Sequence, residues 1–111
     1  MVPNTPVNTY CLPNVNAQVQ PYTSSVYMSL TTNSTGSVYT AFGSQACTIL
    51  DIDNRTGVQL EVQKNGSGPS VLIPVATVRS FSGITNANQL AVRRVDQSNT
   101  TVTTTAEAIT I

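Results

Sequence analysis

The chain contains no histidine and no tryptophan, and charged residues make up only 9% of its 111 residues. Without histidine, the commonest general base and the usual catalytic triads are missing. With no histidine and only two cysteines, no plausible set of zinc ligands can be assembled. We therefore expect a protein that is not an enzyme and that holds no cofactor or metal.

Clustered positive charge is also missing, because five basic and five acidic residues give a formal net charge of zero. Affinity for a phosphate backbone depends on clustered lysine and arginine, so nucleic acid is not expected as a ligand. No run approaches the length of a transmembrane helix, and Met1 to Pro6 has no basic or continuous apolar region of a signal peptide. These patterns predict a protein that is used without Sec-type export and that binds no membrane.

The two cysteines, Cys11 and Cys47, are too few for a disulfide scaffold and lack the spacing of metal ligands. Two interpretations stay open from the sequence. The thiols are buried and reduced, or a disulfide between them fixes the N-terminal region to the body of the protein.

Residues 1–23 differ in composition from the rest of the chain. Met1 to Pro21 contains four prolines and no charged side chain. Proline removes a backbone donor and pushes the preceding residue toward extended geometry, so we expect an extended arm. Apolar side chains along it are spaced as anchors for a partner, and the candidates are Val7, Tyr10, Leu12 and Val15. The alternative is a tail with no partner.

Residues 24–111 consist of short alternations of apolar and polar side chains, separated by turns. Leu50 and Ile52 are expected to face inward and Asp51 and Asp53 outward, with a bulge at Ile49, which is out of phase. The expected strands start near Ser24 and include the segments around residues 38–42, 46–53, 58–63, 71–75, 77–81, 89–96 and 100–105.

The turn residues support this reading, because Asn65-Gly66 favours the positive φ values of a tight hairpin. No stretch shows a sustained helical period. About eight short strands at this spacing predict an all-β fold, a small antiparallel β-sandwich. With no tryptophan and no central cysteine pair, an immunoglobulin-type core is not expected, and a jelly-roll-like sandwich is favoured.

Asp51 and Asp53 form the main carboxylate pair in the sequence. Alternate residues on a strand lie about 6.5–7 Å apart, a separation that glycosidases can use. The chain has few aromatic residues to line a substrate cleft, so a solvated pair is the favoured interpretation. A weak calcium site formed with Asn54 is an alternative, although the spacing is not that of an EF-hand.

Three arginines, Arg79, Arg93 and Arg94, stand out on a chain with so little charge. Adjacent residues on a strand point to opposite faces, so Arg93 and Arg94 are expected to separate. They are expected to pair with acidic residues such as Asp96, Glu61 or Asp51. Arginine is also favoured at protein interfaces, so all three are candidates for binding a partner.

Two segments, Ile52 to Val62 and Ser82 to Asp96, resemble small β-sandwich decoration (cement) proteins of tailed-phage virions. The resemblance extends over roughly Ala46 to Thr105 and consists of a turn, an alternating strand, an asparagine-rich loop and an Arg-Arg strand. It implies a jelly-roll-like body, often trimeric, that binds the major capsid protein or other virion proteins and stabilises the shell. It also implies a location in the virion, which assembles in the host cytoplasm, and no catalytic residues.

Two other functions stay open from the sequence. A neck, tail or baseplate accessory protein of a virion would have the same composition but ring stoichiometry. A carbohydrate- or receptor-binding module would need an exposed aromatic platform. The aromatic residues available for one are Tyr10, Tyr22, Tyr27, Tyr39, Phe42 and Phe81.

Overall fold

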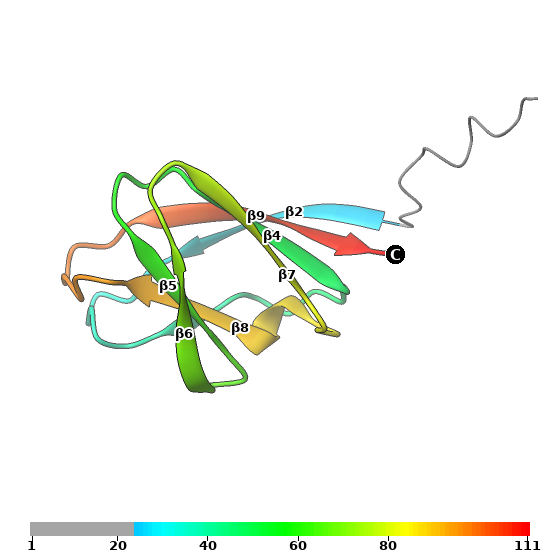
Figure 1. Cartoon of the computed structure of the whole chain (residues 1–111), viewed down its shortest axis with the longest axis horizontal. Helices are drawn as coiled ribbons and strands as arrows, with labels where there is room; N and C mark the ends of the chain where they lie inside the picture. The colour runs from blue at the N-terminus through cyan, green and yellow to red at the C-terminus, as the bar shows by residue number, and fades with distance from the viewer. Residues whose placement is uncertain (1–23) are drawn as a thin grey trace, which may run out of the picture.

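Two four-stranded antiparallel β-sheets, packed face to face, make up the described part of the protein (Figure 1). The computed structural model describes residues 24–111. The first sheet has the order β2 (Ser24–Thr31), β9 (Thr103–Thr110), β4 (Ile49–Asn54) and β7 (Thr77–Ser82). The second sheet has the order β3 (Thr40–Ala41), β8 (Leu90–Arg94), β5 (Leu60–Lys64) and β6 (Ser67–Ile73).

The strand order is that of a jelly roll. Every connection between consecutive strands from β2 to β9 crosses from one sheet to the other, except the β5–β6 hairpin. The first and last of these strands, β2 and β9, pair over eight residues, from Ser24 opposite Thr110 to Thr31 opposite Thr103. Eight strands folded into two sheets in this way form a double Greek key. The predicted all-β, jelly-roll-like sandwich is confirmed.

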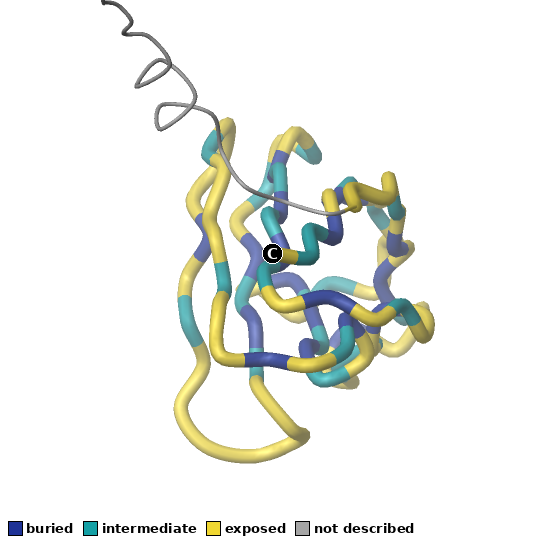
Figure 2. Tube along the Cα trace, turned by 90° about the vertical axis from the view of Figure 1, so that its right-hand side faces the viewer, coloured by how far each residue is buried: buried dark blue, intermediate teal, exposed yellow. Residues whose placement is uncertain are grey.

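The core lies between the sheets, where every second residue of each central strand points inward. Leu50 and Ile52 of β4 are completely buried, while Asp51 and Asp53 point outward, as the alternation predicted. Burying one such side chain contributes roughly 1.5–3 kcal/mol. Figure 2 shows the alternation of buried and exposed positions along the strands. Apolar core side chains with at most 2% exposure include Phe42, Leu50, Ile52, Leu60, Val62, Ile73, Leu90 and Val92.

The predicted tight hairpin connects β5 and β6. Asn65 and Gly66 both adopt positive φ, 55° and 70°, which a two-residue turn of the favoured twist requires. The register is irregular just before this turn, between Val62 and Lys64. Residues 64–70 around the hairpin are exposed, so the tip projects from the sandwich.

Two expectations about the strands were wrong. The register of β4 is unbroken on both sides, so there is no bulge at Ile49. Ile49 instead points outward, directly opposite Ile109 of β9, which partly covers it. The last strand runs from Thr103 to Thr110, beyond the expected range of 100–105, because Ala106 and Ala108 are small residues that the sandwich buries.

The helical element within residues 24–111 is η3 (Ala87–Gln89), a single 3-10 turn before β8. Asn86 and Gln89 form a capping box at its start, in which each side chain accepts from the backbone of the other residue. Across these same residues, no helix combines the length and the apolar character needed to cross a membrane.

Candidate functional site

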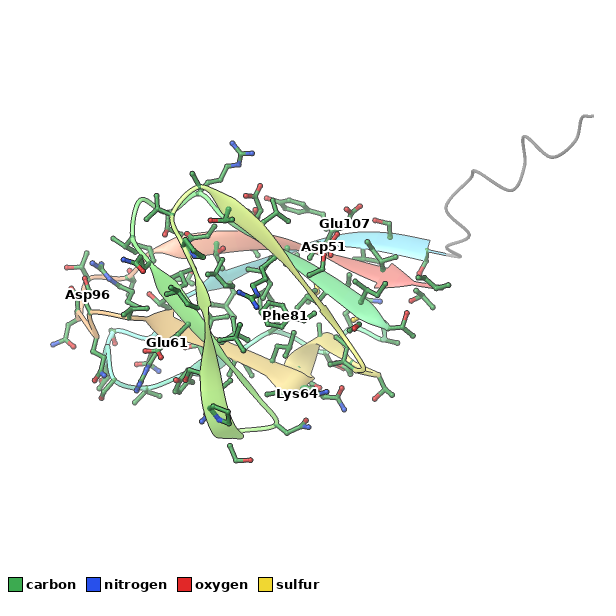
Figure 3. The ribbon with its side chains drawn as sticks, viewed as in Figure 1. Asp51, Glu61, Lys64, Phe81, Asp96 and Glu107 are labelled. Carbon is green, nitrogen blue, oxygen red and sulfur yellow. The ribbon has the colours of Figure 1, made fainter. Side chains whose placement is uncertain are left out.

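One row of outward side chains crosses all four strands of the first sheet. Tyr27 of β2 lies opposite Glu107 of β9, Glu107 lies opposite Asp51 of β4, and Asp51 lies opposite Ser80 of β7. Figure 3 shows Asp51 and Glu107 close together on this sheet. The long-range register therefore brings together residues that are up to 80 positions apart in the sequence.

The outer face of the first sheet is also hollowed. We call this surface the acidic face; it contains a depression of about 350 Å³ lined by Tyr27, Asp51, Asp53, Val78, Thr105, Ala106 and Glu107. A second depression, of about 550 Å³, continues along the same sheet and shares Asp51 and Glu107 with the first. Tyr27 is 74% exposed and Val78 is 55% exposed, so large side chains with little cover border the carboxylates.

The three carboxylates of the acidic face are held in different ways. Asp53 forms an ion pair with Arg55, whose Nε lies 3.0 Å away. Asp51 accepts a hydrogen bond of 2.5 Å from the Ser80 hydroxyl, and Glu107 accepts one from the Ser25 hydroxyl. Neither Asp51 nor Glu107 forms an ion pair with a residue of the 24–111 region.

Asp51 and Glu107 are directly opposed residues of like charge, and such cross-strand pairs destabilise a sheet by a few tenths of a kcal/mol. The acidic face therefore carries a like-charge repulsion that no ion pair within residues 24–111 neutralises. Its chemistry is that of an acceptor: carboxylate oxygens beside an exposed phenol ring can receive hydrogen bonds or a positive charge.

The structure overturns the calcium hypothesis for Asp51, Asp53 and Asn54. Asn54 is completely buried and points away from the two aspartates, into the end of the sandwich. Its Nδ2 donates to the carbonyls of Val58 at 2.8 Å and Ile73 at 2.9 Å. In the part of the chain that the structure describes, no three histidine, cysteine, aspartate or glutamate residues are grouped to hold a metal ion.

Arg93 lies on the outer face of the second sheet and is fully engaged there. Its Nε lies 3.0 Å from the Glu61 carboxylate, and its guanidinium carbon lies 4.3 Å from the centre of the Tyr39 ring. It also donates to the Ser37 carbonyl at 2.8 Å. The Tyr39 hydroxyl is hydrogen bonded to the Ser70 hydroxyl. Arg93, Glu61 and Tyr39, here called the Arg93 cluster, satisfy one another within the chain.

Arg94 points to the opposite face, as the alternation predicted, and its side chain is nearly buried at the end of β8. It donates two parallel hydrogen bonds, 2.9 and 2.8 Å long, to the Asp96 carboxylate. These hydrogen bonds lower the pKa of Asp96 and raise the pKa of Arg94 from their ordinary values. The expected structural pairing is thus confirmed for Arg93 and Arg94.

The third arginine does not fit that expectation. Arg79 of β7 is exposed and donates to the Leu72 carbonyl at 3.2 Å, and it forms no ion pair with any residue from 24 to 111. The three arginines belong to different surfaces, since Arg79 lies in the first sheet and the other two in the second. They do not form a common basic patch.

The predicted anchors Val7, Tyr10, Leu12 and Val15 lie outside the described residues, and so does Cys11. Cys47 is buried and forms no disulfide with any residue from 24 to 111. Burial raises the pKa of this thiol above its ordinary value, because a buried thiolate loses its hydration.

Sequence reasoning found Asp51 and Asp53 but missed Tyr27, Val78 and Glu107 as members of the same surface. No local pattern marks Glu107, which follows a run of threonines in β9. It reaches Asp51 through the pairing of β4 with β9, a contact between segments far apart in the sequence. Comparison with models of known protein families gave no match, and comparison with curated protein sequences gave none.

Proposed function

We propose that this chain is a non-enzymatic structural protein of a virus particle, a decoration protein that binds the outer surface of the capsid and stabilises the shell. The jelly roll supports the proposal, because this fold is common among viral capsid proteins. The same fold also occurs in lectins and cupins, and a fold alone does not define a function. The proposal therefore depends mainly on the properties of the molecule's surface.

The acidic face is the observation that carries the proposal. It combines an exposed tyrosine with two opposed carboxylates that have no cationic partner within residues 24–111. A partner that covers it and places a cationic side chain between Asp51 and Glu107 gains the apolar area of Tyr27 and neutralises the repulsion between the two carboxylates. Tyrosine suits such a position because its ring is apolar and its hydroxyl can keep a hydrogen-bond partner when buried.

The rest of the surface suits a protein that becomes covered in an assembly. Charged residues make up only 9% of the chain, and burying a neutral polar group costs far less than burying a charge. The proposed partner is the major capsid protein or another virion protein, and the proposed oligomer is a trimer. Contacts that exist only in the assembled shell add their binding free energy to its stability, and many copies act together.

Re-addition to capsids provides the test. Capsids of the virus that encodes the chain, prepared without it, are mixed with purified protein, and bound copies are counted by quantitative mass spectrometry. We expect saturable binding in a fixed ratio to the major capsid protein and a higher temperature of capsid rupture. Tyr27→Ala should reduce the occupancy at least tenfold, whereas Val38→Ala, at an exposed position outside the acidic face, should not. Absence of wild-type binding would overturn the proposal.

A carbohydrate- or receptor-binding module is the second candidate, and one observation favours it. Tyr27 lies at a depression that also contains Asp51 and Asp53, and sugars are bound by aromatic rings together with carboxylate acceptors. A glycan array tests this candidate: binding that Tyr27→Ala and Asp53→Asn both abolish would place it ahead of capsid decoration. A neck or tail accessory role would instead give a ring of six or twelve copies in solution.

A further inference from the structure

Within residues 24–111 the sandwich has four edge strands, and three of them are protected against pairing with another chain. An edge strand exposes unpaired backbone N–H and C=O groups that can accept a foreign strand unless it is short, bulged, charged or interrupted by proline. β3 has only two residues, and β6 contains Pro69 next to an irregular register. β7 carries Arg79, which reaches across to the Leu72 carbonyl.

The fourth edge strand, β2, has none of these devices. Its eight residues contain no charge and no proline, and its register with β9 is unbroken. Val26 and Tyr27 are both exposed although they point to opposite faces, so both sides of its first half are open. Within residues 24–111, no strand pairs with the outer edge of β2.

The hydrogen-bond pattern shows which backbone groups face that open edge. The Thr32 N–H donates to the Val102 carbonyl at 2.9 Å, which marks this pair as hydrogen bonded. Hydrogen-bonded and non-hydrogen-bonded pairs alternate along an antiparallel ladder. Even-numbered residues of β2 therefore bond to β9. The residues whose N–H and C=O groups point away from the sheet are Ser25, Tyr27, Ser29 and Thr31.

The chain itself contains a segment that matches this edge. Residues 14–20 lie between Pro13 and Pro21, and they contain neither proline nor charge. Apolar residues alternate with amides along the whole run, with Val15, Ala17 and Val19 in the apolar set and Asn14, Asn16, Gln18 and Gln20 in the amide set. Paired with β2, one side would extend the apolar inner face beside Val26 and Met28, and the other would meet hydroxyl side chains.

The short connection favours a second copy over the same chain as the source of this segment. Only residues 21–23 separate it from Ser24, and Pro21, Tyr22 and Thr23 are not residues that readily take the positive φ of a tight hairpin. A parallel arrangement within one chain would need a crossover of about a dozen residues or more. Neither requirement applies when the segment comes from a neighbouring copy.

We propose that the free edge of β2 binds residues 14–20 of a second copy of this chain as an added strand of the first sheet. The segment and the edge are different surfaces, so the interaction is heterologous, and because each copy carries both it can close into a ring. The inference deepens the proposed function, because it names the contact that would hold the decoration trimer together. The number of three copies in the ring rests on that proposed function.

The test uses full-length protein and a proline at the open edge. Ser29→Pro removes an N–H that points away from β9, so the β2–β9 ladder keeps its hydrogen bonds, and edge strands tolerate proline. Ser29→Ala is the matched control because it keeps the N–H. Light scattering coupled to size exclusion should give three times the monomer mass for the wild type and for Ser29→Ala, and the monomer mass for Ser29→Pro.

A second variant tests the donated segment and covers the case in which Ser29→Pro fails to fold. N–H groups of consecutive strand residues point in opposite directions, so the double variant Ala17→Pro/Gln18→Pro removes one inter-strand donor in any register. It should also be monomeric, while Gln18→Ala should keep the wild-type mass. Hydrogen exchange should show that the Tyr27 amide is protected in the wild type and at least tenfold less protected in the double variant.

A wild-type mass that both proline variants leave unchanged would overturn the inference, and so would a monomeric wild type. A monomer with a protected Tyr27 amide would show that the segment pairs within its own chain. A monomer that still binds capsids would contradict this inference and the proposed trimer, and it would leave the proposed capsid binding intact. A trimer that Ser29→Pro disrupts but that does not bind capsids would support this inference and contradict the proposed function.

Discussion

The two sheets of the sandwich share one core, yet their outer faces are completed in different ways. On the second sheet, Arg93 bridges Glu61 and the Tyr39 ring, so the charges are matched within the chain. On the first sheet, Glu107 lies opposite Asp51 and beside an exposed Tyr27. A surface whose polar groups are already satisfied gains little from a partner, because binding would only exchange one set of hydrogen bonds for another.

The edge strands of the two sheets also differ, and again the first sheet is the less protected one. The second sheet ends in the two-residue β3 and in β6 with its proline, whereas the first sheet ends on one side in the long, uncharged β2. In the proposed function, the first sheet is the one that binds a partner and the second sheet stays exposed. The comparison also suggests experiments that should affect the two sheets differently.

The largest effect is expected where the two sheets are joined. Asn54 ends β4 of the first sheet and donates to the Ile73 carbonyl at the end of β6 in the second. Asn54→Ala would leave buried carbonyls without donors, which should cost about 3 kcal/mol in the free energy of unfolding. Urea unfolding measures this cost, and Asn88→Ala, at an exposed asparagine, should change it by less than about 0.5 kcal/mol. Equal effects of the two variants would refute the role of Asn54.

A moderate effect is expected on the outer face of the second sheet, which contains the Arg93 cluster. Arg93→Met would remove the ion pair with the partly buried Glu61 and the contact with Tyr39, and should cost about 1–2 kcal/mol. Arg79→Met, which removes an exposed arginine of the first sheet, should cost less than about 0.5 kcal/mol. Thermal and urea unfolding of both variants would sharpen the comparison. A larger loss of stability for Arg79→Met than for Arg93→Met would contradict the comparison.

A small effect of opposite sign is expected on the acidic face. Asp51→Asn removes the like-charge repulsion from Glu107 and keeps an oxygen that can accept from Ser80, so unfolding should become harder by about 0.2–0.5 kcal/mol. The gain should shrink as salt is raised, because exposed charges are screened. A loss of stability that does not depend on salt would show that Asp51 is a structural residue like Glu61.

The smallest effect concerns the pH dependence at the end of the second sheet. The hydrogen bonds from Arg94 hold the pKa of Asp96 below its ordinary value. The stability that they supply is present above the unfolded-state pKa of about 3.9 and is lost as the pH falls through the lower folded-state value. Asp96→Asn should therefore lose less stability than the wild type between about pH 6 and about pH 2. An identical acid profile for both proteins would exclude this contribution.

Local patterns in the sequence predicted the local features of the fold. The alternation around Leu50 and Ile52 identified the buried side of β4, and Asn65-Gly66 identified the hairpin. Both depend on neighbouring residues only. The bulge expected at Ile49 failed because an outward isoleucine can be covered by Ile109 from another strand, which no local pattern reveals.

The candidate site was less predictable, because it depends on which strands become neighbours. Asp51 and Asp53 were recognised from their spacing, but Glu107 and Tyr27 join them only through the pairing of β9 with β4 and β2. The partners of Arg93 were among those expected, since opposite charges are few in this chain. The contact between Arg93 and Tyr39 was not expected, because no local pattern in the sequence indicates that their two segments become neighbours.

The difference between the two sheets can be measured directly by covalent modification of tyrosines, because within residues 24–111 each outer face carries one. Tyr27 is 74% exposed on the first sheet, and Tyr39 lies beneath Arg93 on the second. Nitration of the free protein and of the capsid-bound protein, followed by mass spectrometry of the separated peptides, gives the rate at each ring. We expect capsid binding to slow the modification of Tyr27 at least tenfold and to leave Tyr39 unchanged. Protection of Tyr39 with Tyr27 still reactive would show that the partner binds the second sheet, and it would contradict this account.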